Sequence, residues 1–177
     1  MLAVLIAGIF VLIHFLLVDF RRDSPSLPGG YRSTIVSARK GLFEGSFRYT
    51  VLRKAAEGGI QSFRLTVEGA RARRPAGAPS PGGTGDVRVG ALMGARLRCA
   101  GSRIACTANS SERQPVLTPQ DSAEWNWTIA TPEAGKATVT LTLTAYYEGT
   151  REVLAETSPI EQDLDIEGEG NFWGGDR

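Results

Sequence analysis

The pattern of apolar and polar positions changes once along the chain, near residue 20. Between residues 1 and 18 the only strongly polar side chain is His14. As a helix, this run would be about 27 Å long, close to the hydrocarbon thickness of a bilayer. No Lys or Arg precedes the run and no Ala-x-Ala-like site follows it, unlike a cleaved signal peptide. The sequence therefore predicts one uncleaved transmembrane helix over residues 1–20, in contact with membrane lipid.

After a Pro-, Gly- and Ser-containing stretch that predicts a linker over residues 21–32, apolar and polar side chains alternate with a period of two. Residues 47–52 and 63–68 follow this pattern. The clearest case is residues 136–147, where four threonines alternate with Val139, Leu141, Leu143 and Ala145. Such alternation is typical of an antiparallel strand with one buried face.

Eight or nine such strands, separated by Gly-containing turns, predict the fold class. We expect an all-β, Ig-like antiparallel β-sandwich over residues 33–167, preceded by the single N-terminal transmembrane helix. No amphipathic helix is evident after the anchor. Residues 73–85, rich in Pro and Gly, predict a long flexible surface loop, and residues 168–177 a flexible tail.

The two tryptophans Trp125 and Trp127 fall on one face of a predicted strand, and Ile129 continues that face. Because an aromatic side chain of this size buries a large apolar area, we expect both to lie in the core between two sheets. The alternative is an exposed aromatic platform that binds an envelope carbohydrate or another ligand, using Trp125 with Tyr146, Tyr147 or Trp173.

The segment around these tryptophans also resembles a known module. Its features are Trp125-x-Trp127, a turn from Pro132 to Gly135, the long alternating strand that follows, and an Arg-Gln-Pro-Val run at residues 113–116. Over residues 86–166 the chain resembles a membrane-tethered β-sandwich module of uncharacterised bacterial proteins. The resemblance implies the sandwich fold and an accessory role beside a partner protein. It supplies no catalytic residue.

The two cysteines, Cys99 and Cys106, flank a predicted turn at Ser102 and Arg103. In a hairpin with this turn they would lie opposite each other, close enough for a disulfide. The alternative is a pair of half-buried thiols in a reducing cytosol. Arg21 and Arg22 after the anchor favour a cytoplasmic domain, whereas a disulfide favours a domain outside the cytoplasm, and we expect the latter.

Charge is distributed unevenly although the formal net charge is only +1. Residues 21–105 carry 16 basic and 5 acidic side chains, and residues 106–177 carry 4 and 13. This predicts either a basic binding face or strands of opposite charge that neutralise each other as neighbours. Basic residues are not interspersed with aromatics on one element, so nucleic acid is not an expected partner.

Candidate chemistry is sparse. His14 is the only histidine, so nucleophile–histidine pairs and histidine metal sites are unavailable after the anchor. An acidic row in residues 161–167 predicts either a Ca²⁺ site or a solvated strand face. We expect no enzyme, no cofactor and no metal. The expected function is a membrane-anchored interaction or sensing module with a protein partner, in the bacterial inner membrane as a single-pass protein.

Overall fold

The computed structural model describes residues 29–72, 82–101 and 103–168. The predicted anchor at residues 1–20, with His14, lies outside the described residues, as do all but the first residue of the predicted tail. Within the part of the chain that the structure describes, no helix is long and apolar enough to cross a bilayer.

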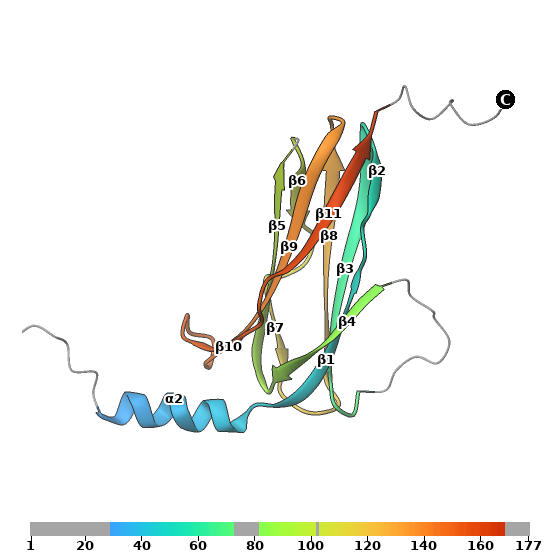
Figure 1. Ribbon diagram of the computed structural model, residues 1–177. Helices are drawn as coiled ribbons and strands as arrows, with labels where there is room; N and C mark the ends of the chain where they lie inside the picture. The colour runs from blue at the N-terminus through green and yellow to red at the C-terminus, as the bar shows by residue number, and fades with distance from the viewer. Residues whose placement is uncertain (1–28, 73–81, 102, 169–177) are drawn as a thin grey trace, which may run out of the picture. The chain divides into compact units, whose positions relative to one another are not determined.

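Two β-sheets follow residue 42 (Figure 1). Sheet A contains, in spatial order, β4 (Gly82–Val89), β1 (Phe43–Thr50), β3 (Gly59–Gly69), β8 (Ser122–Thr131) and β6 (Ala105–Ala108). Sheet B contains β2 (Lys54–Ala56), β11 (Ile160–Glu167), β9 (Gly135–Tyr146), β5 (Ala91–Gly101) and β7 (Arg113–Val116), and β10 (Val153–Glu156) also pairs with β9. All these pairs are antiparallel except β2 with β11. The prediction of an all-β sandwich is confirmed.

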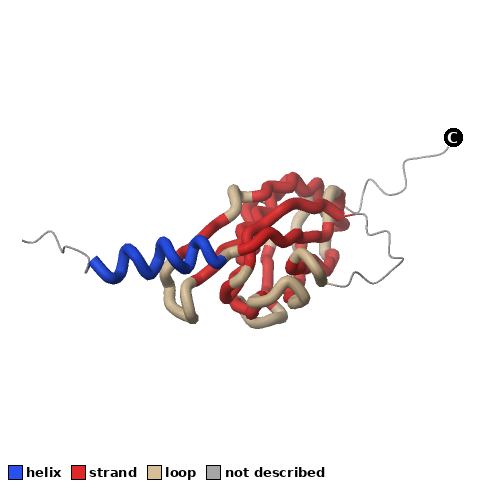
Figure 2. Tube along the Cα trace, turned by 90° about the horizontal axis from the view of Figure 1, so that it is seen from below, coloured by secondary structure: helices blue, strands red, loops and turns tan. Residues whose placement is uncertain are grey.

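The core is built from the alternating positions of the long strands. On β3 the buried side chains are Phe63, Leu65 and Val67, and on β9 they are Val139, Leu141, Leu143 and Ala145. The polar residues between them face outward, as the period of two predicts. Figure 2 shows the strands gathered in one body and joined by loops.

The expectation that no amphipathic helix follows the anchor is wrong, because α2 runs from Gly29 to Gly41. Its apolar stripe is short, with Ile35 and Ala38 packed against the core. The sequence therefore lacks the extended apolar repeat, at intervals of three and four residues, that would have predicted the helix. Arg88 on β4 donates hydrogen bonds to the carbonyl oxygens of Leu42 (2.7 Å) and Arg39 (3.3 Å). These bonds tie the C-terminal end of α2 and the residue that follows it to β4. Residues 29–34 belong to a separate unit from the rest of the described chain.

The Gly-rich end of the predicted loop at residues 73–85 is a strand instead. Residues 73–81 lie outside the described residues, but β4 begins at Gly82. A side chain at Gly85 would come within 2.5 Å of the Phe47 ring, and one at Gly83 would overlap the ring of Tyr49. The two aromatic rings of β1 therefore cover glycine backbone on the neighbouring strand. Glycine is required here by that close approach and does not indicate a loop.

The chain passes from sheet A to sheet B between β1 and β2, and Gln162 on β11 spans this crossing. Its side-chain oxygen accepts a hydrogen bond from the backbone N–H of Leu52 (2.9 Å), and its amide nitrogen donates to the carbonyl of Thr50 (3.4 Å). Gln162 thereby ties the backbone of this crossing to β11 of sheet B.

Candidate interaction surfaces

The two tryptophans lie inside the sandwich. Trp125 is 1% exposed and Trp127 4% exposed, both on the inner face of β8. The indole N–H of Trp125 donates to the carbonyl of Glu112 at 3.1 Å, and the Trp127 ring meets the Phe63 ring edge-on at a centroid distance of 5.8 Å. Neither ring is available to a ligand in this structure.

The other aromatics of the expected platform do not assemble into one either. Tyr146 is buried beneath Arg113, whose guanidinium carbon lies 3.9 Å from the ring centroid. The ring also packs on Gly94, where an added side chain would approach it to 2.6 Å. Tyr147 is half-buried, and Trp173 lies outside the described residues.

Cys99 and Cys106 are joined as a disulfide, with their Cα atoms 6.0 Å apart. The expected hairpin between them is wrong, because Cys99 lies on β5 of sheet B and Cys106 on β6 of sheet A. The strands on either side of the turn separate, β5 pairing with β9 and β6 with β8. The bond therefore links the two sheets across the sandwich rather than two strands of one sheet.

The acidic row lies on β11. Glu161, Asp163 and Asp165 are exposed there, while Leu164 and Ile166 between them are buried. Among the described residues no group of three potential metal ligands comes together. At the end of the strand, Glu167 accepts a hydrogen bond from Lys54 at 2.6 Å, which raises the pKa of the lysine above its usual value.

Basic and acidic parts of the sequence meet across the fold. Among the described residues, ion pairs connect the parts before and after position 105 at four places: Lys54–Glu167, Arg64–Glu124, Arg96–Glu112 and Arg103–Glu133. The uneven distribution along the chain therefore becomes neighbouring opposite charges in space. Such exposed pairs add little stability individually, but they reduce the basic character of the first half.

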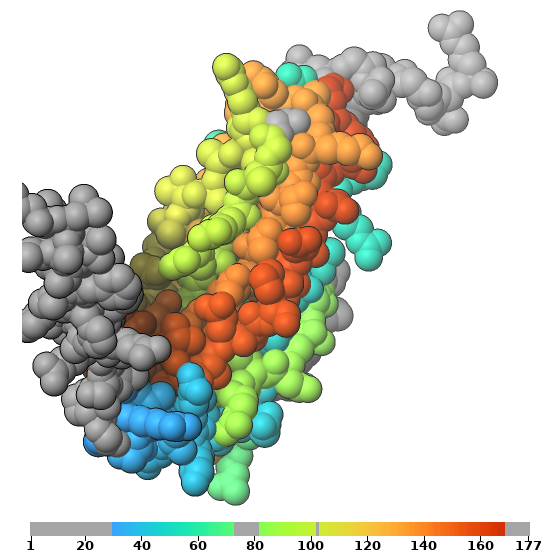
Figure 3. Space-filling model, turned by 60° about the vertical axis from the view of Figure 1, so that its left-hand side comes forward, coloured from blue at the N-terminus to red at the C-terminus, as the bar shows by residue number. Residues whose placement is uncertain are grey.

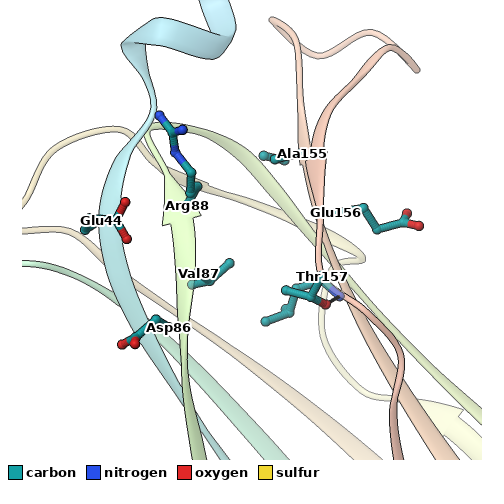
Figure 4. Close-up of a pocket in the computed structure, with 9 residues that line it drawn as sticks. Glu44, Asp86, Val87, Arg88, Ala155, Glu156 and Thr157 are labelled. Carbon is teal, nitrogen blue, oxygen red and sulfur yellow. Dashed lines mark hydrogen bonds between the residues drawn. The ribbon is translucent and has the colours of Figure 1, made fainter.

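A groove opens between the two sheets, where β4 and β10 face each other (Figure 4). Its volume is about 290 Å³, and its apolar lining comes from Val87 of β4, Leu143 and Ala145 of β9, and Ala155 of β10. Figure 4 shows Val87 and Ala155 pointing into the space from opposite walls, whereas the carboxylates of Asp86 and Glu156 point away from it.

Both walls of the groove are strand edges. In the described residues β4 pairs only with β1, and β10 pairs only with β9. Unpaired edges carry backbone donors and acceptors that can bind another strand. Glu44, Asp86 and Glu156 place three carboxylates around the groove; those of Asp86 and Glu156 lie on the outer side of their strands, and Glu156 accepts a hydrogen bond from Thr144 at 2.9 Å. Among the described residues that line the groove, the one cation, Arg88, is hydrogen-bonded to the carbonyls of Arg39 and Leu42. The groove therefore combines an apolar floor, acidic rims and open backbone.

No sequence motif marked this groove. Val87 and Ala155 are far apart in the chain. They line the same groove only because β4 and β10 lie on the same side of the sandwich. The one available signal was the alternation Asp86-Val87-Arg88-Val89, which predicts a short strand after the glycines.

The turn before β8 is organised by Asp121. Its carboxylate accepts hydrogen bonds from the backbone N–H groups of Leu117 and Thr118, both at 2.9 Å, and from the Thr118 hydroxyl at 2.8 Å. The hydrogen bond from the Thr118 hydroxyl, followed by those from the two backbone N–H groups, holds the pKa of Asp121 below its usual value. The backbone of the same turn accepts from Gly69 and Arg71 at the end of β3.

Replacing Asp121 with asparagine should therefore remove an acid-sensitive part of the stability. A carboxyl whose pKa is lowered by folding stabilises the protein above its unfolded pKa, near 3.8, and loses this contribution as the pH falls through the folded value. Urea unfolding at several pH values should show D121N less stable than the parent protein at pH 6, with the difference shrinking below pH 4. Asp86→Asn is the control, and an unchanged difference across this range would contradict the assignment.

Comparisons with known proteins give no family for this chain. No family model matches it, and no curated protein matches its sequence. Among solved structures it is similar to the crystal structure of the S-layer protein SbsC domains 4 and 5, with a TM-score of 0.37 and 10% identity. That match covers 66% of this chain and 42% of the other. A likeness at this level says nothing about the function of this chain, and the resemblance to a bacterial tethered module stays a prediction.

Proposed function

We propose that this protein is a membrane-anchored, non-enzymatic interaction module that binds an extended segment of a partner protein in the groove between β4 and β10. The observation that carries the proposal is the pair of open strand edges around an apolar floor. An extended segment can add to such an edge through its backbone and insert alternate side chains into the groove. At about 290 Å³ the groove is small for an enclosed small-molecule site, but it suits one or two side chains of a strand.

The proposal includes an Ig-like sandwich held outside the cytoplasm by the predicted helix at residues 1–20. In its support, the order β1-β3-β8-β6 facing β11-β9-β5 parallels the ABED and GFC sheets of Ig domains. The disulfide and the tryptophans occupy other strands than in antibody domains. A disulfide at Cys99 and Cys106 also favours an oxidising compartment, with the protein in the bacterial inner membrane.

The acidic rim defines the chemistry of the partner segment: small apolar residues alternating with Lys or Arg. The test is titration of the full chain with an eight-residue peptide of alternating valine and lysine, followed by amide NMR. We expect shifts concentrated on β4 and β10. The same peptide with glutamate in place of lysine should bind at least about tenfold more weakly, because like charges then face the rim.

Matched variants locate the binding. Ala155→Arg fills the groove, and we expect it to abolish the shifts. Ala108→Arg places the same side chain at an exposed position of β6, a strand outside the groove, and should leave binding unchanged. Equal binding of the lysine and glutamate peptides, or equal effects of the two variants, would contradict the proposed function.

A further inference from the structure

The outer face of sheet B carries opposite charges on either side of a row of threonines. In Figure 3 the strands β5, β9 and β11 lie side by side in yellow-green, orange and red-orange. The outward side chains of β5 include Arg96 and Arg98, and those of β11 are Glu161, Asp163 and Asp165. On β9 the outward row begins with Lys136, in register with Asp165, and continues with threonines. The face is therefore basic along one edge and acidic along the other.

The strand register places one basic and one acidic residue in the same row. Thr140 of β9 is the partner of Arg98 on one side and of Glu161 on the other. Both charged residues are exposed, and neither forms an ion pair with another described residue. Their strands are two strand spacings apart, about 10 Å.

The outer face of sheet A differs in this respect. There, Thr66 also lies between a basic and an acidic residue, Arg48 and Glu124. Arg48, however, pairs with Glu68 at 2.7 Å and Glu124 with Arg64 at 3.5 Å. Charges on sheet A are thus matched within the molecule, whereas the row through Thr140 leaves its two charges unmatched.

We propose that the outer face of sheet B binds a second copy of this chain, about a two-fold axis that runs along β9 beside Thr140. Such a rotation brings Arg98 of one copy opposite Glu161 of the other, twice, and Thr140 opposite Thr140. This is the self-complementary pattern of a symmetric dimer. Because the axis is parallel to the strands, both copies begin β1 at the same end, which suits two chains tethered to one membrane if the proposed anchor is correct.

The size of the face sets the expected strength. Three strands by about six residues cover roughly 15 Å by 20 Å, well below the area of a standard interface. The dimer should therefore be weak in dilute solution. Two chains held on one vesicle reach a high effective concentration, which favours the pair.

The substitution Thr140→Cys tests the position of the two-fold axis, because the axis would place the new cysteine of one copy opposite that of the other. The full chain is reconstituted in phosphatidylcholine vesicles, oxidised briefly and run on a non-reducing gel. Thr66→Cys is the matched control, because Thr66 is a half-buried threonine at mid-strand on the other outer face. We expect T140C to give roughly fivefold more covalent dimer than T66C. Equal yields would overturn the proposal.

A charge exchange tests the pairing itself in the T140C background. Arg98→Glu and Glu161→Arg should each reduce the crosslinked fraction several-fold, because like charges then face each other. The double variant R98E/E161R restores opposite charges and should restore the crosslink. A double variant as weak as the singles would overturn the pairing. Groove binding of the valine–lysine peptide should be unaffected throughout, so failure here is distinguishable from failure of the proposed function.

Discussion

Replacing Trp125 with alanine should lower the free energy of unfolding by about 3–5 kcal/mol, the range for a large aromatic removed from a packed core. Trp125 is almost completely buried on the inner face of β8. The substitution removes its packing and leaves the Glu112 carbonyl without the indole donor. A loss of this size is comparable to much of the stability of a typical domain, so partial unfolding at room temperature is also a supporting result.

Urea denaturation followed by circular dichroism measures this effect, and two variants sharpen it. Trp125→Phe keeps most of the apolar volume and should cost less than alanine, with the lost hydrogen bond contributing about 1 kcal/mol. Leu117→Ala, at a side chain 59% exposed, is the control and should change stability by less than about 0.5 kcal/mol. If W125A were as stable as L117A, the placement of Trp125 in the core would be wrong.

Removing the disulfide should be the next largest effect. The double variant C99A/C106A is expected to lose about 2–3 kcal/mol, because the bond closes a loop of eight residues in the unfolded chain. Because the bond links β5 of sheet B to β6 of sheet A, the variant should expose this edge of the sandwich first. Hydrogen exchange should therefore increase at β6 and at its pairing with β8 more than in the centre of sheet B.

The control for this prediction is treatment of the parent protein with a reductant. Reduction should reproduce the loss seen in the double variant and should not destabilise that variant further. Thiol labelling of intact cells, with and without reductant, then reports the compartment: label taken up only after reduction supports an oxidised pair outside the cytoplasm. Equal stability of the oxidised and reduced protein would contradict a stabilising role for the bond.

The period-two pattern predicted the strands well where one face of the strand is buried. In β3 and β9 the apolar residues at every second position are the ones that fill the core. Trp125, Trp127 and Ile129 follow the same rule on β8. Burial of one face fixes which side chains of these strands point inward, because a slip of one residue would turn the whole apolar set toward solvent.

The pattern failed where partners distant in the sequence decide the conformation. Gly83 and Gly85 suggested a loop because glycine is common in turns, yet they form a strand beneath the rings of Phe47 and Tyr49. Cys99 and Cys106 suggested a hairpin because they are close in sequence, yet their strands enter different sheets. The local sequence contains neither the rings nor the neighbouring strands that decide these outcomes.

By itself, the sequence determined an apolar segment of membrane-spanning length, a run of half-buried strands and the residues that face the core, since each depends on hydrophobic periodicity along one element. Within the described part of the chain, tertiary structure alone decided which strand edges stay open, where the groove between β4 and β10 forms, and which charges remain unmatched beside Thr140. These features depend on pairing between segments far apart in the chain, which burial of one face does not specify.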